Sequence, residues 1–149
     1  MVLMLLWGLY SFLIPSYASV LEANWGVKLP VSACCREVYR QDTGPSFHGD
    51  GVRYHVFSCI NSAAIDELLP WSAEEGHTLE WSQTAGEERQ YRSYSQSAQL
   101  WLHELDVPET QLPVYESCVC WYSSAPDNSQ LILFWDPGSR RLYIVENLI

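Results

Sequence analysis

The sequence predicts an α+β domain: an antiparallel sheet of about five strands with two inserted helices, arranged in two layers and preceded by an apolar N-terminal helix. Three observations lead to this prediction. Short alternating or wholly apolar segments end at clusters of Gly, Pro, Asp and Asn. Two segments with helical spacing lie between the second and the third of these predicted strands. At 149 residues, 48% of them hydrophobic, the chain is long enough for one domain with its own core.

Residues 1–21 form the apolar N-terminal segment, and no charged side chain precedes Glu22. As a helix the segment would measure roughly 31 Å, enough to cross the hydrocarbon core of a bilayer. Small residues at Ser16 and Ala18 also fit a signal peptide that is cleaved after Ala18. We therefore expect a signal peptide or membrane anchor at 1–21, favouring the uncleaved form, and a single domain at 22–149. The alternative is a helix buried in the core of a soluble domain.

A hairpin is predicted next along the chain. Its first strand is "CREVYRQD" at 35–42, and its second is "VRYHVFSCI" at 52–60. Alternation in the second strand places two sets of side chains on opposite faces. One set is Val52, Tyr54, Val56 and Ser58, and the other is Arg53, His55, Phe57 and Cys59. Between the strands, Gly-Asp-Gly at 49–51 suits a turn with positive φ angles.

The two predicted helices follow this hairpin. The first begins after an N-cap at Asn61 or Ser62 and ends at Pro70. The second covers about 95–105, because apolar residues recur there with helical spacing. These residues are Ala98, Trp101, Leu102 and Leu105. The polar segment between the helices, 72–93, is the least structured part of the chain by pattern.

The last third of the chain predicts three more strands, at 115–124, 129–136 and 140–149. Turn formers separate them, and the Asp-Pro-Gly-Ser segment at 136–139 is typical of a type II turn. The unbroken apolar run at 131–135 predicts a central strand that is buried on both faces.

The charge of the chain excludes some classes of partner. Eight Lys and Arg residues oppose eighteen Asp and Glu residues, which gives a formal net charge of −10. Nucleic-acid binding relies on attraction between basic side chains and phosphates, so we expect no nucleic-acid partner. An anionic membrane surface would also repel this charge as a whole. Attachment to a membrane must therefore depend on the apolar residues 1–21.

The five cysteines, Cys34, Cys35, Cys59, Cys118 and Cys120, do not have the Cys-x-x-Cys spacing of zinc or thioredoxin-like sites. In an exported chain, we expect a disulfide between Cys34 or Cys35 and Cys118 or Cys120, with at least one thiol left over. The alternative is that several of them are small buried apolar side chains.

Four polar residues of the hairpin form the best candidate binding site: Asp42, His48, Asp50 and His55. Histidine and carboxylate side chains are common metal ligands, yet the spacing follows no recurrent metal motif. We favour a structural turn in which glycines set the backbone, Asp50 accepts bonds from amides and His48 braces the loop. Neither a Gly-x-Ser-x-Gly motif nor a phosphate-binding loop occurs in the sequence. We expect no catalytic residues, no metal and no cofactor.

The segment 42–57, "DTGPSFHGDGVRYHVF", resembles a hairpin of small uncharacterised bacterial proteins, many of them from Gram-positive species. Those proteins carry an apolar N-terminal anchor or signal before a similar run. The matching residues here are Asp42, Gly44, Phe47, His48, Gly49, Asp50 and Gly51, and Pro45-Ser46 replaces a shorter glycine link. The closing segment "LILFWDPGSRRLYIVE" is similar in style to theirs. The resemblance implies an extracytoplasmic location and this fold style, and it implies no activity.

Three functional hypotheses follow. The first is a non-enzymatic module, anchored in a membrane through residues 1–21 or secreted, that binds a protein or cell-envelope partner. The second is a small metal-assisted hydrolase that uses Asp42, His48, Asp50 and His55. The third is a soluble intracellular immunity or regulatory protein in which residues 1–21 pack in the core.

Overall fold

The computed structural model of the chain describes residues 16–44, 50–69 and 85–149, and of residues 85–93 it describes the backbone alone. Residues 1–15, most of the polar segment 72–93 and His48 lie outside the described residues. No helix among the described residues is long and apolar enough to span a bilayer.

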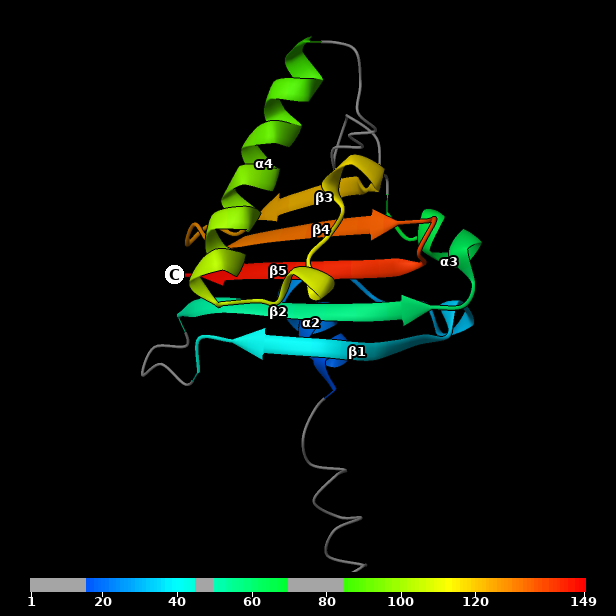
Figure 1. Cartoon of the computed structure of the whole chain (residues 1–149). Helices are drawn as coiled ribbons and strands as arrows, with labels where there is room; N and C mark the ends of the chain where they lie inside the picture. Colours follow the sequence, from blue (N-terminus) through cyan, green and yellow to red (C-terminus); the bar gives the residue numbers. More distant parts are fainter. Residues whose placement is uncertain (1–15, 45–49, 70–84) are drawn as a thin grey trace, which may run out of the picture.

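A five-stranded antiparallel sheet forms the centre of the structure (Figure 1). Its strands are β1 (Cys35–Asp42), β2 (Gly51–Cys59), β3 (Val119–Ser124), β4 (Gln130–Asp136) and β5 (Arg141–Leu148). They lie in the order β1-β2-β5-β4-β3, so β1 and β3 are the edge strands. The predicted α+β class and five-stranded sheet are confirmed.

One helix precedes the first two strands, and the other two lie between those strands and the last three. They are α2 (Tyr17–Trp25), α3 (Ser62–Asp66) and α4 (Ala85–Glu104), with 3₁₀ turns η1 (Val31–Ala33), η2 (Glu109–Gln111) and η3 (Tyr115–Ser117). The helix expected at about 95–105 begins ten residues earlier. Its first half is polar, so it has no apolar spacing, but Glu, Arg and Gln favour helix intrinsically. The strand expected from residue 115 begins at Val119, after η3.

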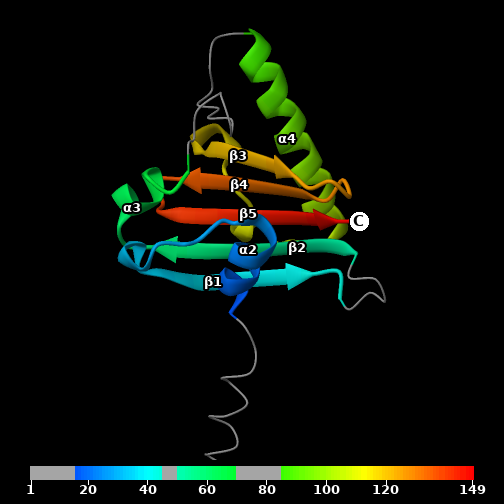
Figure 2. The same cartoon turned by 180° about the vertical axis from the view of Figure 1, so that it is seen from behind.

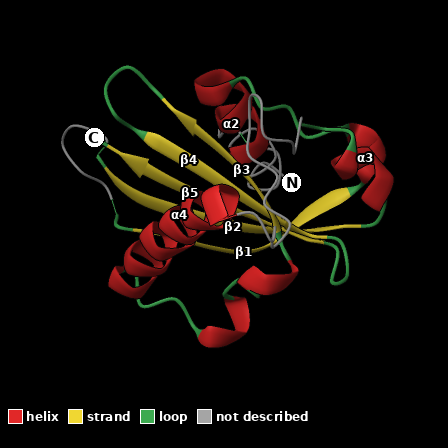
Figure 3. Cartoon of the chain, turned by 90° about the horizontal axis from the view of Figure 1, so that it is seen from above, coloured by secondary structure: helices red, strands yellow, loops and turns green. Residues whose placement is uncertain are grey.

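The sheet is covered on both faces (Figure 3). On one face, the α4 face, Ala98 and Leu102 of α4 pack against residues such as Tyr54 and Phe134. On the other, the α2 face, Leu21 of α2 and Ile65 of α3 pack against a second buried cluster. The structure therefore has three layers where two were expected. The wholly buried run Leu131–Asp136 of β4 explains the difference, because a strand that is apolar on both faces requires cover on both.

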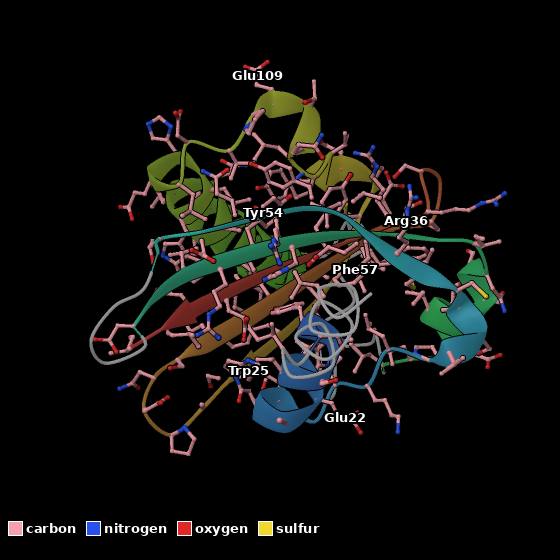
Figure 4. All side chains as sticks on the ribbon, turned by 90° about the horizontal axis from the view of Figure 1, so that it is seen from below. Glu22, Trp25, Arg36, Tyr54, Phe57 and Glu109 are labelled. Carbon is pink, nitrogen blue, oxygen red and sulfur yellow. A yellow bond between two sulfur atoms is a disulfide. The ribbon has the colours of Figure 1, made fainter. Side chains whose placement is uncertain are left out.

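Strand β2 shows how the sequence assigns side chains to these faces. Tyr54 belongs to the cluster of the α4 face, and Phe57 belongs to that of the α2 face. Figure 4 shows Tyr54 on the side of the sheet that carries Glu109, and Phe57 on the side that carries Trp25. The predicted alternation of β2 is confirmed.

The disulfide links Cys35 to Cys59, which are directly opposite each other in the β1–β2 pair. The expected bond to Cys118 or Cys120 is wrong. Cys35 and Cys59 belong to the α2 face, whereas Cys118 and Cys120 are buried in the cluster of the α4 face, so the sheet separates them. Cys34 is free and exposed, and it has a left-handed backbone conformation next to the disulfide.

Helix α2 makes the folded domain begin before residue 22. Ser16 caps the helix, its side chain accepting a hydrogen bond from the backbone N–H of Ser19. Leu21 is 0% exposed in the cluster of the α2 face. Figure 2 shows α2 lying over the sheet on this side. The boundary expected between 21 and 22 therefore falls inside a helix that belongs to the core.

We predict that removing the disulfide with Cys35→Ala and Cys59→Ala lowers the free energy of unfolding by about 3 kcal/mol, because the link closes a loop with a sequence separation of 24. Urea denaturation measures the change. Cys34→Ser is the matched control and should leave the stability almost unchanged. A linked peptide containing Cys118 or Cys120 in a non-reducing digest would contradict the assignment.

We predict that Leu21→Ala lowers the free energy of unfolding by about 2–5 kcal/mol, the usual range when a fully buried leucine is truncated. Asn24→Ala changes an exposed position of the same helix and should have little effect. Equal stability of the two variants in urea would show that α2 does not contribute to the core.

Candidate functional site

The structure describes three of the four predicted site residues, Asp42, Asp50 and His55, and these three do not form one cluster. Asp42 is exposed at the end of β1, where its carboxylate accepts a hydrogen bond from the backbone N–H of Gly44 at 2.7 Å. Asp50 is exposed just before β2, and His48 lies outside the described residues. His55 is buried in the middle of β2 beneath α2. Within the described part of the chain, no group of three His, Cys, Asp or Glu side chains is placed to hold a metal ion.

The most connected polar cluster lies instead between α2 and the sheet, and its centre is Glu146 of β5. The Glu146 side chain is 0% exposed. Its two carboxylate oxygens accept hydrogen bonds from the Tyr17 hydroxyl at 2.8 Å and from the Trp25 indole N–H at 2.7 Å. One carboxylate of the sheet thus binds both ends of α2. A buried charge requires such partners, because without them its desolvation would oppose folding.

His55 connects this cluster to the edge strand. Its Nδ1 lies 2.5 Å from Glu37 Oε1 of β1. An ionised carboxylate can only accept, so the neutral imidazole donates its Nδ1 proton. The ring of His55 also stacks on Tyr17, with ring centroids 3.3 Å apart and nearly parallel planes. Tyr17 therefore contacts both His55 and Glu146, which lie on neighbouring strands.

Burial shifts the pKa values of His55 and Tyr17. Burial lowers the pKa of His55 below its usual value, although the hydrogen bond and charge of Glu37 act in the opposite direction. Burial, followed by the charge of Glu146 and the hydrogen bond to it, raises the pKa of Tyr17 well above its usual value. At neutral pH both side chains are therefore uncharged.

Other acidic side chains also hold the backbone and the helices in place. The Trp135 indole N–H donates a hydrogen bond to Asp66 of α3 at 2.8 Å. Asp136 is buried at the β4–β5 turn, where its carboxylate accepts bonds from the backbone N–H of Gly138 and of Ser139 and from the Ser139 hydroxyl. These carboxylates stabilise the fold and are engaged by the chain itself.

The buried thiols of the α4 face, Cys118 and Cys120, also contribute to the fold. Burial raises the pKa of Cys118 to about 12 and raises that of Cys120 as well. Because the thiolate is the reactive form, both thiols are inert at neutral pH. They belong to the apolar core, as the alternative interpretation of the cysteines expected.

Sequence reasoning missed Tyr17, Glu37 and Glu146 as members of the cluster. For Glu146, the sequence did contain a signal. Alternation places Glu146 on the same face of β5 as the apolar residues Leu142 and Ile144, so a carboxylate was to be expected on a buried face. The partners themselves are far apart in the chain: the sequence separation of Tyr17 and Glu146 is 129. Only His55 belongs both to the predicted set and to the observed cluster.

We predict that Glu146→Gln lowers the free energy of unfolding by about 1–3 kcal/mol, since one of the two donors from α2 then meets an amide N–H₂ group instead of an acceptor. Glu116→Gln makes the same change at an exposed position and should have almost no effect. Combining Glu146→Gln with Tyr17→Phe in a double-mutant cycle measures the coupling; strictly additive losses would contradict the contact.

We predict that His55 makes stability depend on pH. Its pKa is lower in the folded than in the unfolded chain, so the unfolded chain takes up the proton first as the pH falls below about 6.5. The stability that this group contributes is complete above that pH and is lost as the pH falls through the folded-state pKa. The difference in unfolding free energy between the parent chain and His55→Gln should shrink over this interval. His103→Gln, at an exposed position, should leave the pH profile unchanged.

The chain matches no protein-family model, no curated protein and no solved structure. Its function is therefore inferred from the contacts, the burial and the charge of the described residues.

Proposed function

We propose that the chain is a non-enzymatic interaction module, held at a membrane by its uncleaved apolar N-terminus, that binds a protein or cell-envelope partner on the extracytoplasmic side. The observation that carries this proposal is the attachment of α2 to the sheet through Glu146. Helix α2 begins at Tyr17, directly after the apolar residues 1–15. Whatever holds those residues therefore holds the folded domain with almost no linker between them.

Two further contacts support the uncleaved form and the location. Cleavage after Ala18 would remove Tyr17, and with it the hydrogen bond to Glu146 and the stacking on His55. The Cys35–Cys59 disulfide is typical of proteins that function in an oxidising environment outside the cytoplasm.

The described surface supports binding to a partner. Residues 100–116 expose two large apolar side chains, Leu100 at 64% and Val114 at 58%. The same residues expose four carboxylates, those of Glu104, Asp106, Glu109 and Glu116. Exposed apolar side chains among like charges favour a partner that is itself partly apolar and basic.

A second candidate, a soluble intracellular regulatory or immunity protein, is favoured by one observation: Tyr17 and Leu21 pack against the sheet, as that hypothesis expected of residues 1–21. The metal-assisted hydrolase has no such support, because Asp42, Asp50 and His55 are engaged or exposed separately in the structure. The two remaining candidates differ in what residues 1–15 do.

We predict that the tagged full-length chain is recovered in the membrane fraction, whereas a chain that starts at Ser16 is released as a folded, soluble protein. The new start leaves α2 and its Ser16 cap complete, so stability in urea should be retained. Recovery of the full-length chain in the cytosol would contradict the proposal and favour the soluble candidate. A chain that starts at Glu22 is not a suitable control, because it lacks Tyr17 and Leu21.

A further inference from the structure

The first described residues lie beside the edge strand β1. Figures 1 and 2, seen from opposite sides, both place the N-terminal end of α2 at the β1 edge of the sheet. Tyr17 at this end stacks on His55, which is the cross-strand neighbour of Arg40 in β1. If residues 1–15 enter a membrane, as the proposed function states, the β1 edge is the part of the domain nearest to the lipid.

The net charge is distributed unevenly between the two parts of the chain. Residues 16–60, which include α2, β1 and β2, contain four basic and four acidic side chains. Residues 61–149 contain four basic and fourteen acidic side chains, so this part carries the whole net charge of −10. The basic residues of the first part are Lys28, Arg36, Arg40 and Arg53, and the acidic ones are Glu22, Glu37, Asp42 and Asp50. The elements next to the N-terminal end of α2 are thus neutral overall.

Two arginines of β1 lack an acidic partner among the described residues. Arg36 and Arg40 are exposed, and Val38 between them is 38% exposed. The nearby acids have other partners: Glu37 is bound to His55, and Glu22 lies 3.4 Å from Lys28. The remaining acids near β1 lie at its C-terminal end. Asp42 is the last residue of the strand, and Asp106 follows Leu105, whose carbonyl accepts a hydrogen bond from Gln41. The two guanidinium groups remain available to bind an anion.

We propose that the β1 edge, defined by Arg36, Val38 and Arg40, contacts phospholipid headgroups, with both guanidinium groups bound to headgroup phosphates. Guanidinium groups form strong, charge-assisted hydrogen bonds with phosphate oxygens. Basic side chains close to an anionic leaflet also gain from its surface potential, which decays over about 8 Å in physiological salt. The β1 edge therefore faces the lipid, and the exposed side chains of residues 100–116 stay accessible to a partner on the α4 face. This inference rests on the proposed membrane attachment.

Vesicle binding of the purified full-length chain tests the contact. Vesicles of phosphatidylcholine alone report attachment through the apolar N-terminus, and vesicles that also contain phosphatidylglycerol report the added electrostatic contribution. We expect the parent chain to bind the anionic vesicles more tightly. Arg36→Gln with Arg40→Gln should weaken binding to the anionic vesicles by roughly 25-fold, about fivefold for each arginine, and should leave binding to neutral vesicles unchanged.

Arg140→Gln with Arg141→Gln is the matched control, since it removes the same charge from the β4–β5 turn and should keep the preference for anionic vesicles. Equal binding of the parent chain to both kinds of vesicle, or equal losses in the two double variants, would overturn the β1 contact alone. A chain that binds neither kind of vesicle would overturn the proposed membrane attachment together with it.

The exposed thiol of Cys34 gives a direct measurement of orientation. A fluorophore on Cys34 lies next to the start of β1, and the buried Cys118 and Cys120 should not react. A quencher attached to lipid headgroups should then reduce its emission. The same fluorophore on Pro126→Cys in a Cys34→Ser background lies at the β3–β4 turn, across the sheet, and should keep its emission. Equal quenching at the two positions would overturn the proposed orientation.

Discussion

The attachment of α2 to the sheet depends on a single buried carboxylate, that of Glu146. Transfer of this charge from water into the core has an unfavourable desolvation free energy. Hydrogen bonds from donors that reach both carboxylate oxygens offset it. Tyr17 and Trp25, at opposite ends of α2, provide those donors. The helix has only nine residues, too few to be stable alone in water. Its existence therefore follows from this contact and from the burial of Leu21, and the same contact fixes where Ser16 lies relative to the sheet.

The second constraint is the burial of the central strands on both faces. β4 and β5 are apolar over most of their length, so neither face of the sheet can remain in water. The long helix α4 covers one face, and the other is covered by two short helices that have little intrinsic stability. Each short helix is fixed by an indole N–H bonded to a carboxylate, Trp25 to Glu146 and Trp135 to Asp66. On the α2 face, these hydrogen bonds therefore add to the apolar contacts in holding the two short helices against the sheet.

The strands were predictable because alternation and turn residues are local signals: β1 was predicted with its observed bounds, and β2, β4 and β5 within one residue at each end. The contact between α2 and Glu146 was not predictable, because the sequence around Tyr17 contains no signal for a partner near the other end of the chain. The disulfide was within reach, because pairing the two strands of the predicted hairpin places Cys35 opposite Cys59. The face of His55 was predicted from alternation, but its partner Glu37 depends on the register of β1, which a bulge between Glu37 and Tyr39 shifts.

Under the proposed anchoring, location and stability are coupled, because α2 belongs to the core and also follows the apolar residues 1–15 directly. A protease that cut within α2 would separate Tyr17 from Glu146, so the remaining domain would be less stable than the intact chain. If residues 1–15 anchor the chain, as proposed, the same cut would also release the domain. Helix α2 begins at Tyr17, directly after its cap Ser16. A force applied at Ser16 therefore acts on the Tyr17–Glu146 hydrogen bond and on the stacking of Tyr17 on His55. The orientation of the sheet relative to Ser16 is in this way set by the core of the domain.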